Sequence, residues 1–226
     1  LFENSIMGGS FEKSNLVWLT LSLLGLMIGG MISPDIPGNL SLEILEISNA
    51  VLLFVSLLSL GHDKTWGRRF IAVAVITLIA VVLRETTKLF YFEYFYLATI
   101  LLFLLMATWL VAHRVLLTGT VNFNILTGSL ALYLLLGLSW ALVYTLVLEF
   151  SPQALSGFEV ANWHENISHM IYFSFVTLTS LGYGDVTPET SLTQLLTILE
   201  AICGMFYIAV VVASLVTGIR RQTPRT

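Results

Sequence analysis

The sequence predicts an all-α membrane protein with six transmembrane helices and one re-entrant segment that enters and leaves the bilayer on the same side. The first observation is composition: 57% of the 226 residues are hydrophobic and 11% are charged, with a mean hydropathy of +0.89. An average soluble domain carries about 25% charged residues, so a soluble core could not cover this much apolar surface. The second observation is that the apolar residues fall into separate runs, each near the length of about 20 residues that crosses a bilayer.

Six apolar runs are expected to form the transmembrane helices. The third is short, and we expect it to continue through Arg84 toward Thr87, with the charged end of Arg84 reaching the interface. Lys13 ahead of the first run would also suit a signal peptide, but that run is too long and no small-residue cleavage site follows it. The runs cover residues 15–32, 42–60, 70–83, 89–111, 128–150 and 192–219.

The placement of Lys and Arg predicts the orientation, because cytoplasmic loops of membrane proteins carry an excess of these residues. Six spans put both termini on one side of the membrane. If that side is cytoplasmic, only Arg84 and Lys88 lie outside. The cations on the cytoplasmic side are then Lys13, Lys64, Arg68, Arg69, Arg114, Arg220, Arg221 and Arg225.

The segment between the fifth and sixth runs predicts the re-entrant element. A polar loop is expected over 151–167 and a short apolar, aromatic helix over 168–179, with Ser168 or Asn166 as its N-cap. At 1.5 Å per residue this helix spans only about half a bilayer, so it cannot cross. An extended return over 180–185 is expected to bring the chain back to the same side.

The extended return, Ser180-Leu181-Gly182-Tyr183-Gly184-Asp185, predicts an ion pathway. Irregular backbone at membrane depth is tolerated only where it is buried in protein or lines a watery path. Glycines at alternate positions permit positive φ, so that consecutive carbonyls can face one axis and replace the water around a cation. Gly-Tyr-Gly-Asp alone would suit a turn. The preceding half-length helix and the flanking spans favour the ion pathway.

Residues Thr179 to Asp185 resemble the T-x-G-Y-G-D signature of potassium channels, and the resemblance covers about 128–221. It is nearest to bacterial pore-loop channels with a six-helix subunit, which implies a homotetramer in a bacterial or archaeal plasma membrane. It also implies K⁺ as the bound ion and no organic cofactor. Ser180 replaces the usual Thr and Leu181 the usual Val, and we expect potassium selectivity to persist with a looser innermost site. The implied filter residues are Ser180, Leu181, Gly182, Tyr183 and Gly184, with Asp185 at the outer mouth; we call 180–185 the filter segment.

The resemblance divides the chain into a four-helix N-terminal domain (1–127), a pore domain (128–219) and a short basic tail (220–226). The pore domain comprises an outer helix over 128–150, a pore helix over 168–179, the filter segment and an inner helix over 192–219. A voltage sensor needs several Arg or Lys at three-residue spacing, and the fourth run has none, so steep voltage gating is not expected. The tail is a candidate for binding anionic lipid through Arg220, Arg221 and Arg225.

Further residues are predicted to support or line the pore. Tyr172 and Phe173 resemble an aromatic cuff around the filter, although aromatic residues at headgroup depth would explain them almost as well. Val176 and Thr179 lie on the same helix. Glu200 is an acid at membrane depth, which favours a functional role; support of the filter is preferred to direct ion binding. Gly204 fits either a hinge or close packing. One face of the inner helix is expected to line the pore through Met205, Ile208, Val212 and Val216.

Two other functions compete with a potassium-selective channel. A potassium transporter subunit would usually carry several pore loops or internal repeats, and this sequence has one loop and no repeat. A non-selective cation channel is disfavoured by the intact Gly-Tyr-Gly. No enzymatic activity is expected, because the spans contain no pair of His and acidic residues at catalytic spacing. No nucleic-acid partner is expected.

Overall fold

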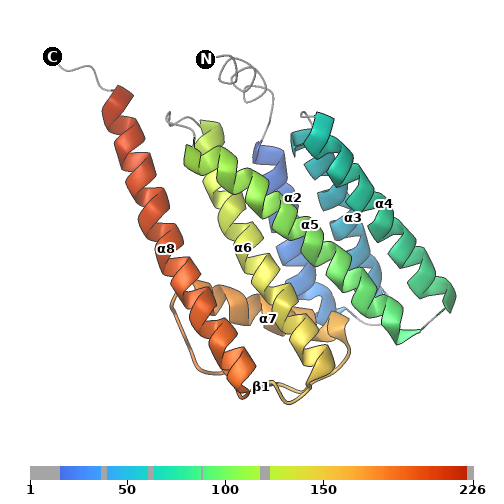
Figure 1. Cartoon of the computed structure of the whole chain (residues 1–226). Helices are drawn as coiled ribbons and strands as arrows, with labels where there is room; N and C mark the ends of the chain where they lie inside the picture. The colour runs from blue at the N-terminus through green and yellow to red at the C-terminus, as the bar shows by residue number, and fades with distance from the viewer. Residues whose placement is uncertain (1–15, 37–39, 61–63, 88, 118–122, 223–226) are drawn as a thin grey trace.

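A computed structural model describes residues 16–36, 40–60, 64–87, 89–117 and 123–222 (Figure 1). Almost all of the described chain is helical. Two short strands pair in antiparallel fashion near one end of the molecule. The elements are α2 (Leu16–Ile32), the 3₁₀ turn η1 (Ser33–Asp35), α3 (Leu40–Leu60), α4 (Lys64–Thr87), α5 (Phe90–Leu117), α6 (Phe123–Phe150), β1 (Leu155–Ser156), α7 (Trp163–Leu178), β2 (Thr187–Pro188) and α8 (Ser191–Gln222).

Five of the described helices are long and apolar enough to cross a membrane: α3, α4, α5, α6 and α8. The prediction of an all-α membrane protein therefore agrees with the structure. The sixth predicted span corresponds to α2, an apolar helix of 17 residues, which is slightly shorter than a typical span. The chain breaks after α2 because Pro34 sits in the first turn of η1, where its ring cannot continue the preceding helix.

The bounds of α4 confirm that the third span is longer than its apolar run, since this helix covers Lys64–Thr87. The Arg84 side chain is buried in the protein, and its guanidinium forms ion pairs with Glu46 of α3 and Glu85. Its position at a membrane interface stays a prediction. Pairing with a carboxylate inside the helix bundle compensates the cost of removing the guanidinium from water, so the side chain does not need to extend toward solvent.

Helix α2 packs against α6 and α7 as well as against α3. The Thr20 hydroxyl donates to the Thr127 carbonyl of α6 at 3.0 Å, and the Ser33 hydroxyl donates to the His164 carbonyl of α7 at 3.3 Å. Helix α6 begins at Phe123, so the predicted boundary at 127/128 falls inside this helix. The first helix is therefore in direct contact with both α6 and α7.

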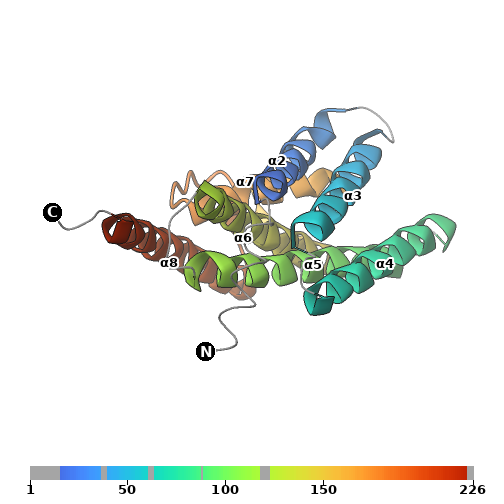
Figure 2. The same ribbon diagram turned by 90° about the horizontal axis from the view of Figure 1, so that it is seen from above.

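Helix α8 lies on the far side of α6 from α3 and α4 (Figure 2). Within the chain it contacts α6, α7 and β2. Most of its described apolar side chains are exposed, including Leu195, Ile198, Met205 and Ile208. An apolar helix surface of this extent requires lipid or another protein surface to cover it.

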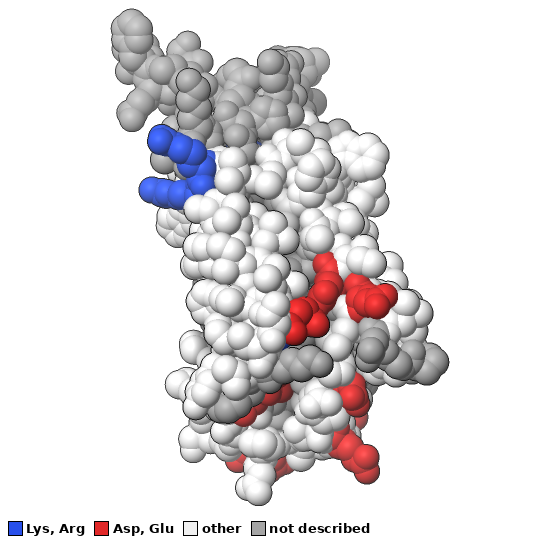
Figure 3. Space-filling model, turned by 90° about the vertical axis from the view of Figure 1, so that its right-hand side faces the viewer, with Lys and Arg blue, Asp and Glu red and all other residues white. Residues whose placement is uncertain are grey.

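On one face of the molecule, the exposed charged side chains separate along its long axis. In the view of Figure 3, Lys and Arg gather at one end, whereas Asp and Glu lie toward the other. Arg68 and Arg69, at the start of α4, are exposed. The exposed acids Glu159, Glu165, Asp185 and Glu189 belong to the end that carries β1, α7 and β2.

Candidate functional site

The re-entrant helix α7 starts at Trp163, five residues before the predicted start at 168. Ser168 and Asn166 are therefore not N-caps, and that prediction is wrong. Asn162 is the N-cap, with its carbonyl accepting from the amides of Glu165 and Asn166 at 2.9 and 3.0 Å. The Asn166 carboxamide instead bonds both backbone groups of Ala161, at 3.0 and 2.7 Å, and thereby fixes the chain entering the helix.

Strands β1 and β2 close the base of the re-entrant segment, since one precedes α7 and the other follows the filter segment. Glu189 reinforces this base by accepting from the hydroxyls of Ser156 at 2.5 Å and Thr187 at 3.0 Å. These bonds hold the pKa of the Glu189 carboxyl below its usual range, with the Ser156 hydroxyl as the larger cause. The segment thus enters and leaves at the same end of the molecule (Figure 1).

The filter segment has an alternating backbone. Ser180, Gly182 and Gly184 have φ of 60°, 58° and 76°, and Leu181 and Tyr183 between them do not have positive φ. Alternation between left-handed and ordinary dihedrals cancels the pleat of a strand, so that successive carbonyls turn toward one side. Gly182 and Gly184 adopt such angles readily, whereas Ser180 does so at an energetic cost. The sequence-based expectation of glycine-dependent positive φ agrees with this geometry.

The start of the filter segment is anchored to the end of α7. The Ser180 amide donates to the Thr177 carbonyl at 2.9 Å, and the Leu181 amide donates to the Val176 carbonyl at 3.0 Å. Thr179 ends the helix as its C-cap. These bonds satisfy carbonyls that would otherwise lack partners at a helix terminus. They also place the filter segment directly beyond the negative end of the α7 dipole.

The side chains of the filter segment have little cover within one chain. Leu181 is 59% exposed and Tyr183 is 68% exposed, although both are large and apolar or aromatic. A single chain therefore holds the backbone in an alternating conformation without packing its outward side chains.

Tyr172 and Asp185 join α7 to the outer end of the filter segment. The Tyr172 hydroxyl donates to a carboxylate oxygen of Asp185 at 2.6 Å. This bond is the main reason why the pKa of the Asp185 carboxyl lies below its usual value. Phe173, the next residue, is buried and meets the Tyr144 ring edge-on, with ring centroids 5.0 Å apart.

A double-mutant cycle should show that Tyr172 and Asp185 act as a pair. In the channel proposed below, we expect Tyr172→Phe and Asp185→Asn each to shorten the time for which the pore conducts, because each removes the same bond at the end of the filter segment. The double variant should then add little to either single change. Single-channel open times of the four proteins measure this. Additive effects would show that the bond does not brace the mouth.

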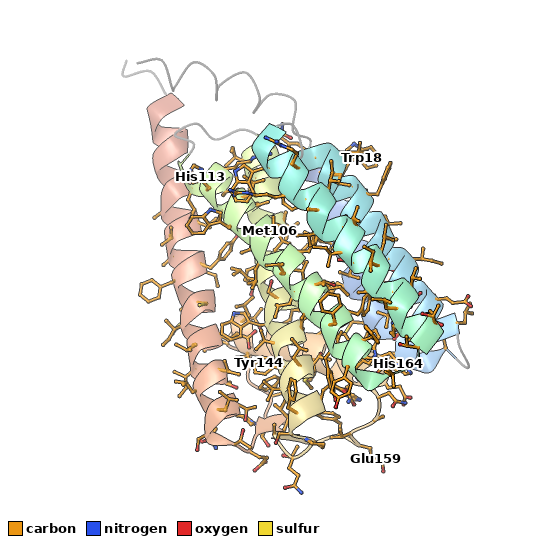
Figure 4. The ribbon with its side chains drawn as sticks, turned by 45° about the vertical axis from the view of Figure 1, so that its right-hand side comes forward. Trp18, Met106, His113, Tyr144, Glu159 and His164 are labelled. Carbon is orange, nitrogen blue, oxygen red and sulfur yellow. The ribbon has the colours of Figure 1, made fainter. Side chains whose placement is uncertain are left out.

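Glu200 lies on α8, faces α6 and α7, and is 0% exposed. One carboxyl oxygen is 2.8 Å from the Tyr144 hydroxyl of α6, and the other is 2.5 Å from the Ser174 hydroxyl of α7. Figure 4 shows Tyr144 between α6 and α8. The carboxyl group thus connects α8 to both neighbouring helices.

Gly204 lies one turn beyond Glu200 and touches the end of α7. A Cβ at this position would overlap the backbone carbonyl oxygen of Leu178. Of the two sequence-based alternatives, close packing is present in this structure, and use as a hinge stays a prediction. Met205 and Ile208 are exposed on the following turns. The side chains of Val212, Val216, Arg220 and Arg221, and residue Arg225, lie outside the described part of the chain.

Sequence reasoning missed Tyr144 and Ser174, the two partners of Glu200. Both are common residues within helices, and only the crossing of α6, α7 and α8 brings them to the acid. Glu200 itself carried the signal, because a carboxyl group at membrane depth requires nearby polar groups.

Comparison with known proteins agrees with this geometry over the second part of the chain. Residues 129–221 match a protein family described as ion channel. The match supports an ion channel. It covers α6 from its seventh residue, α7, the filter segment and nearly all of α8. No curated protein and no solved structure matches the chain.

Proposed function

We propose that four copies of this chain form a potassium-selective channel, with one filter segment from each copy around a common axis. The observation that carries this proposal is the alternation of positive φ at Ser180, Gly182 and Gly184. Four such strands would present stacked rings of carbonyl oxygens to an ion. These rings would replace the hydration shell of K⁺ and let ions move between adjacent sites.

Assembly as a tetramer is supported by the surfaces that one chain leaves uncovered. The side chains of Leu181 and Tyr183 are largely exposed in one chain, and α8 exposes most of its described apolar side chains. One filter segment supplies only one side of a coordination ring, so closed cyclic symmetry is the simplest way to complete it. In such a ring, Leu181 and Tyr183 would pack against a neighbouring copy and fix the ring diameter.

Charge at the two ends of the filter would assist cations. The C-terminal end of α7 leads into Ser180, so its negative dipole end would face the inner side of the pore. Asp185 at the outer end would repeat in each copy and raise the local cation concentration. Met205 and Ile208, with Val212 and Val216, are proposed to line an apolar inner pore that closes by excluding water.

The membrane orientation and the lack of voltage sensing are part of the proposal. Arg68 and Arg69 belong to the start of α4, which lies at the end opposite α7 and β1 (Figure 1); this supports a cytoplasmic assignment for that end of a plasma-membrane protein. Within the described residues of α5, Arg114 is the one Lys or Arg, and it reaches the terminal carbonyls of α3 near Leu60. Because a gating charge is worth about 2.3 kcal/mol per 100 mV, a helix without such charges gives shallow voltage dependence.

Ion flux from liposomes tests the proposal. Purified protein in potassium-loaded liposomes should release potassium down its gradient, and sodium-loaded liposomes should release little. Equal release of both ions would indicate a non-selective cation channel. Potassium movement that requires a second solute gradient would indicate a transporter. Native mass measurement of the same preparation should give four chains; a stable monomer or dimer that conducts would contradict the proposed ring.

A further inference from the structure

The hydroxyl of Ser174 has more acceptors than protons. It lies 2.5 Å from a carboxyl oxygen of Glu200 and 2.8 Å from the backbone carbonyl oxygen of Gly137 on α6. A serine hydroxyl carries one proton, so it can donate to only one of these oxygens. Both separations lie within the O–H···O range, so a second proton in the cluster would allow both contacts to be full hydrogen bonds.

Counting protons distinguishes the two charge states of Glu200. The cluster contains three short oxygen–oxygen contacts: Tyr144 to Glu200, Glu200 to Ser174, and Ser174 to Gly137. With a carboxylate, the two hydroxyls supply two protons for three contacts, and one contact is left without a proton of its own. With a carboxylic acid there are three protons. Tyr144 then donates to Glu200, Glu200 donates to Ser174, and Ser174 donates to Gly137.

The surroundings of Glu200 supply no compensating positive charge. Among the described residues it forms no ion pair, and it is 0% exposed. The ionisable groups that face it are Tyr144 and Tyr133, both on α6. The described part of α7 next to it contributes only the Ser174 hydroxyl. An isolated carboxylate buried without a cation is strongly disfavoured, whereas a neutral acid with all its hydrogen bonds made is not.

We infer that Glu200 is held as a neutral carboxylic acid that donates a hydrogen bond to Ser174. This proton completes a chain of hydrogen bonds, called the tie below, that joins α8 to α6 and α7. Glu200 is thereby a positioning residue for the filter segment, not an ion ligand. The tie connects α8 to α7 six residues before the filter segment begins at Ser180. This consequence for conduction rests on the proposed channel function; the protonation state does not.

The consequence is a proton-dependent connection between the inner helix and the filter. When Glu200 loses its proton, the single Ser174 proton serves two acceptors, which weakens the contact with α8 or with α6. Alkaline conditions that reach this site should therefore loosen α8 from α7, and acidic conditions should preserve the tie.

Infrared difference spectroscopy of the purified full chain in lipid tests the protonation directly. Subtracting the Glu200→Gln spectrum from the wild-type spectrum at neutral pH should reveal a lost carboxylic acid C=O band. Glu159→Gln, which changes an exposed loop acid, should leave that band in place. Loss of a carboxylate band in the Glu200→Gln difference would overturn the inference. Ser174→Ala gives a second test, because the acid band should shift when its acceptor is removed, and a shifted carboxylate band would again contradict it.

Potassium flux from liposomes supplies the functional test. Glutamine can donate to Ser174 and accept from Tyr144 as the neutral acid does, so Glu200→Gln should conduct like wild type but no longer weaken at alkaline pH. Glu200→Ala should reduce flux at least about ten-fold, a loss of about 1.4 kcal/mol. If Glu200→Gln loses as much flux as Glu200→Ala, the claim that a neutral hydrogen-bond donor at position 200 supports conduction is contradicted. If wild-type protein carries no potassium yet shows the acid band, the channel proposal fails and the protonation inference stands.

Discussion

Gly182→Ala is expected to abolish potassium conduction without unfolding the chain. Within one chain, no atom lies within 4 Å of the position that a Cβ would take at Gly182, so the substitution meets no steric barrier to folding of the chain. The effect arises from the backbone, because φ at Gly182 is 58°. A side chain in this left-handed region costs about 1–2 kcal/mol per residue, or about 4–8 kcal/mol over the four copies of the proposed ring. The carbonyls would then turn away from the axis. Potassium flux measures the loss.

Gly25→Ala is the matched control for this substitution. Gly25 lies in α2, is exposed, and also has no atom within 4 Å of its Cβ position, but its φ is helical. We expect this variant to conduct like wild type, since alanine suits a helix better than glycine. A Gly182→Ala protein that conducts normally would show that positive φ at this position is not needed for ion passage.

Gly204→Ala is expected to lower the stability of the assembled protein. Its Cβ would overlap the Leu178 carbonyl, which is backbone and cannot rotate aside as a side chain would. Overpacking of a well-fitted contact costs about 1–3 kcal/mol in each chain. Helix α8 would have to move away from the end of α7, which also anchors the filter segment. Heating followed by size-exclusion chromatography should show loss of the assembled form at a lower temperature.

The same control separates this effect from helix propensity. In an open helix, glycine to alanine stabilises by about 1 kcal/mol, so Gly25→Ala should raise the transition temperature slightly while Gly204→Ala lowers it. A rise for both variants would mean that α8 and α7 do not touch at Gly204 in the assembled protein.

The sequence predicted the helices well where one physical factor dominates. Long apolar runs specify the spans, and the alternate glycines at 182 and 184 specify a backbone with positive φ. Ends of helices were harder to place, because polar residues at the start of a helix resemble a loop. Asn162 followed by Glu165 matches the pattern that starts many helices, and it marks the true beginning of α7.

Contacts between distant segments could not be predicted, since they depend on how the helices cross. The burial of Arg84 beside Glu46 was not predicted from the sequence. Helix α2 was grouped with an N-terminal domain, yet it packs on α6 and α7. The environment of Glu200 shows the same limit: the sequence indicated that this acid requires partners, and only the fold identifies Tyr144 and Ser174 as those partners.

The reversal potential of single channels tests the central claim most directly. Purified protein in a planar bilayer would face a tenfold potassium gradient and an equal sodium gradient in the opposite direction. A potassium-selective pore should reverse near the potassium equilibrium potential, about 59 mV from zero for a monovalent ion. A reversal close to zero would contradict potassium selectivity, and a reversal of opposite sign would indicate a sodium pathway.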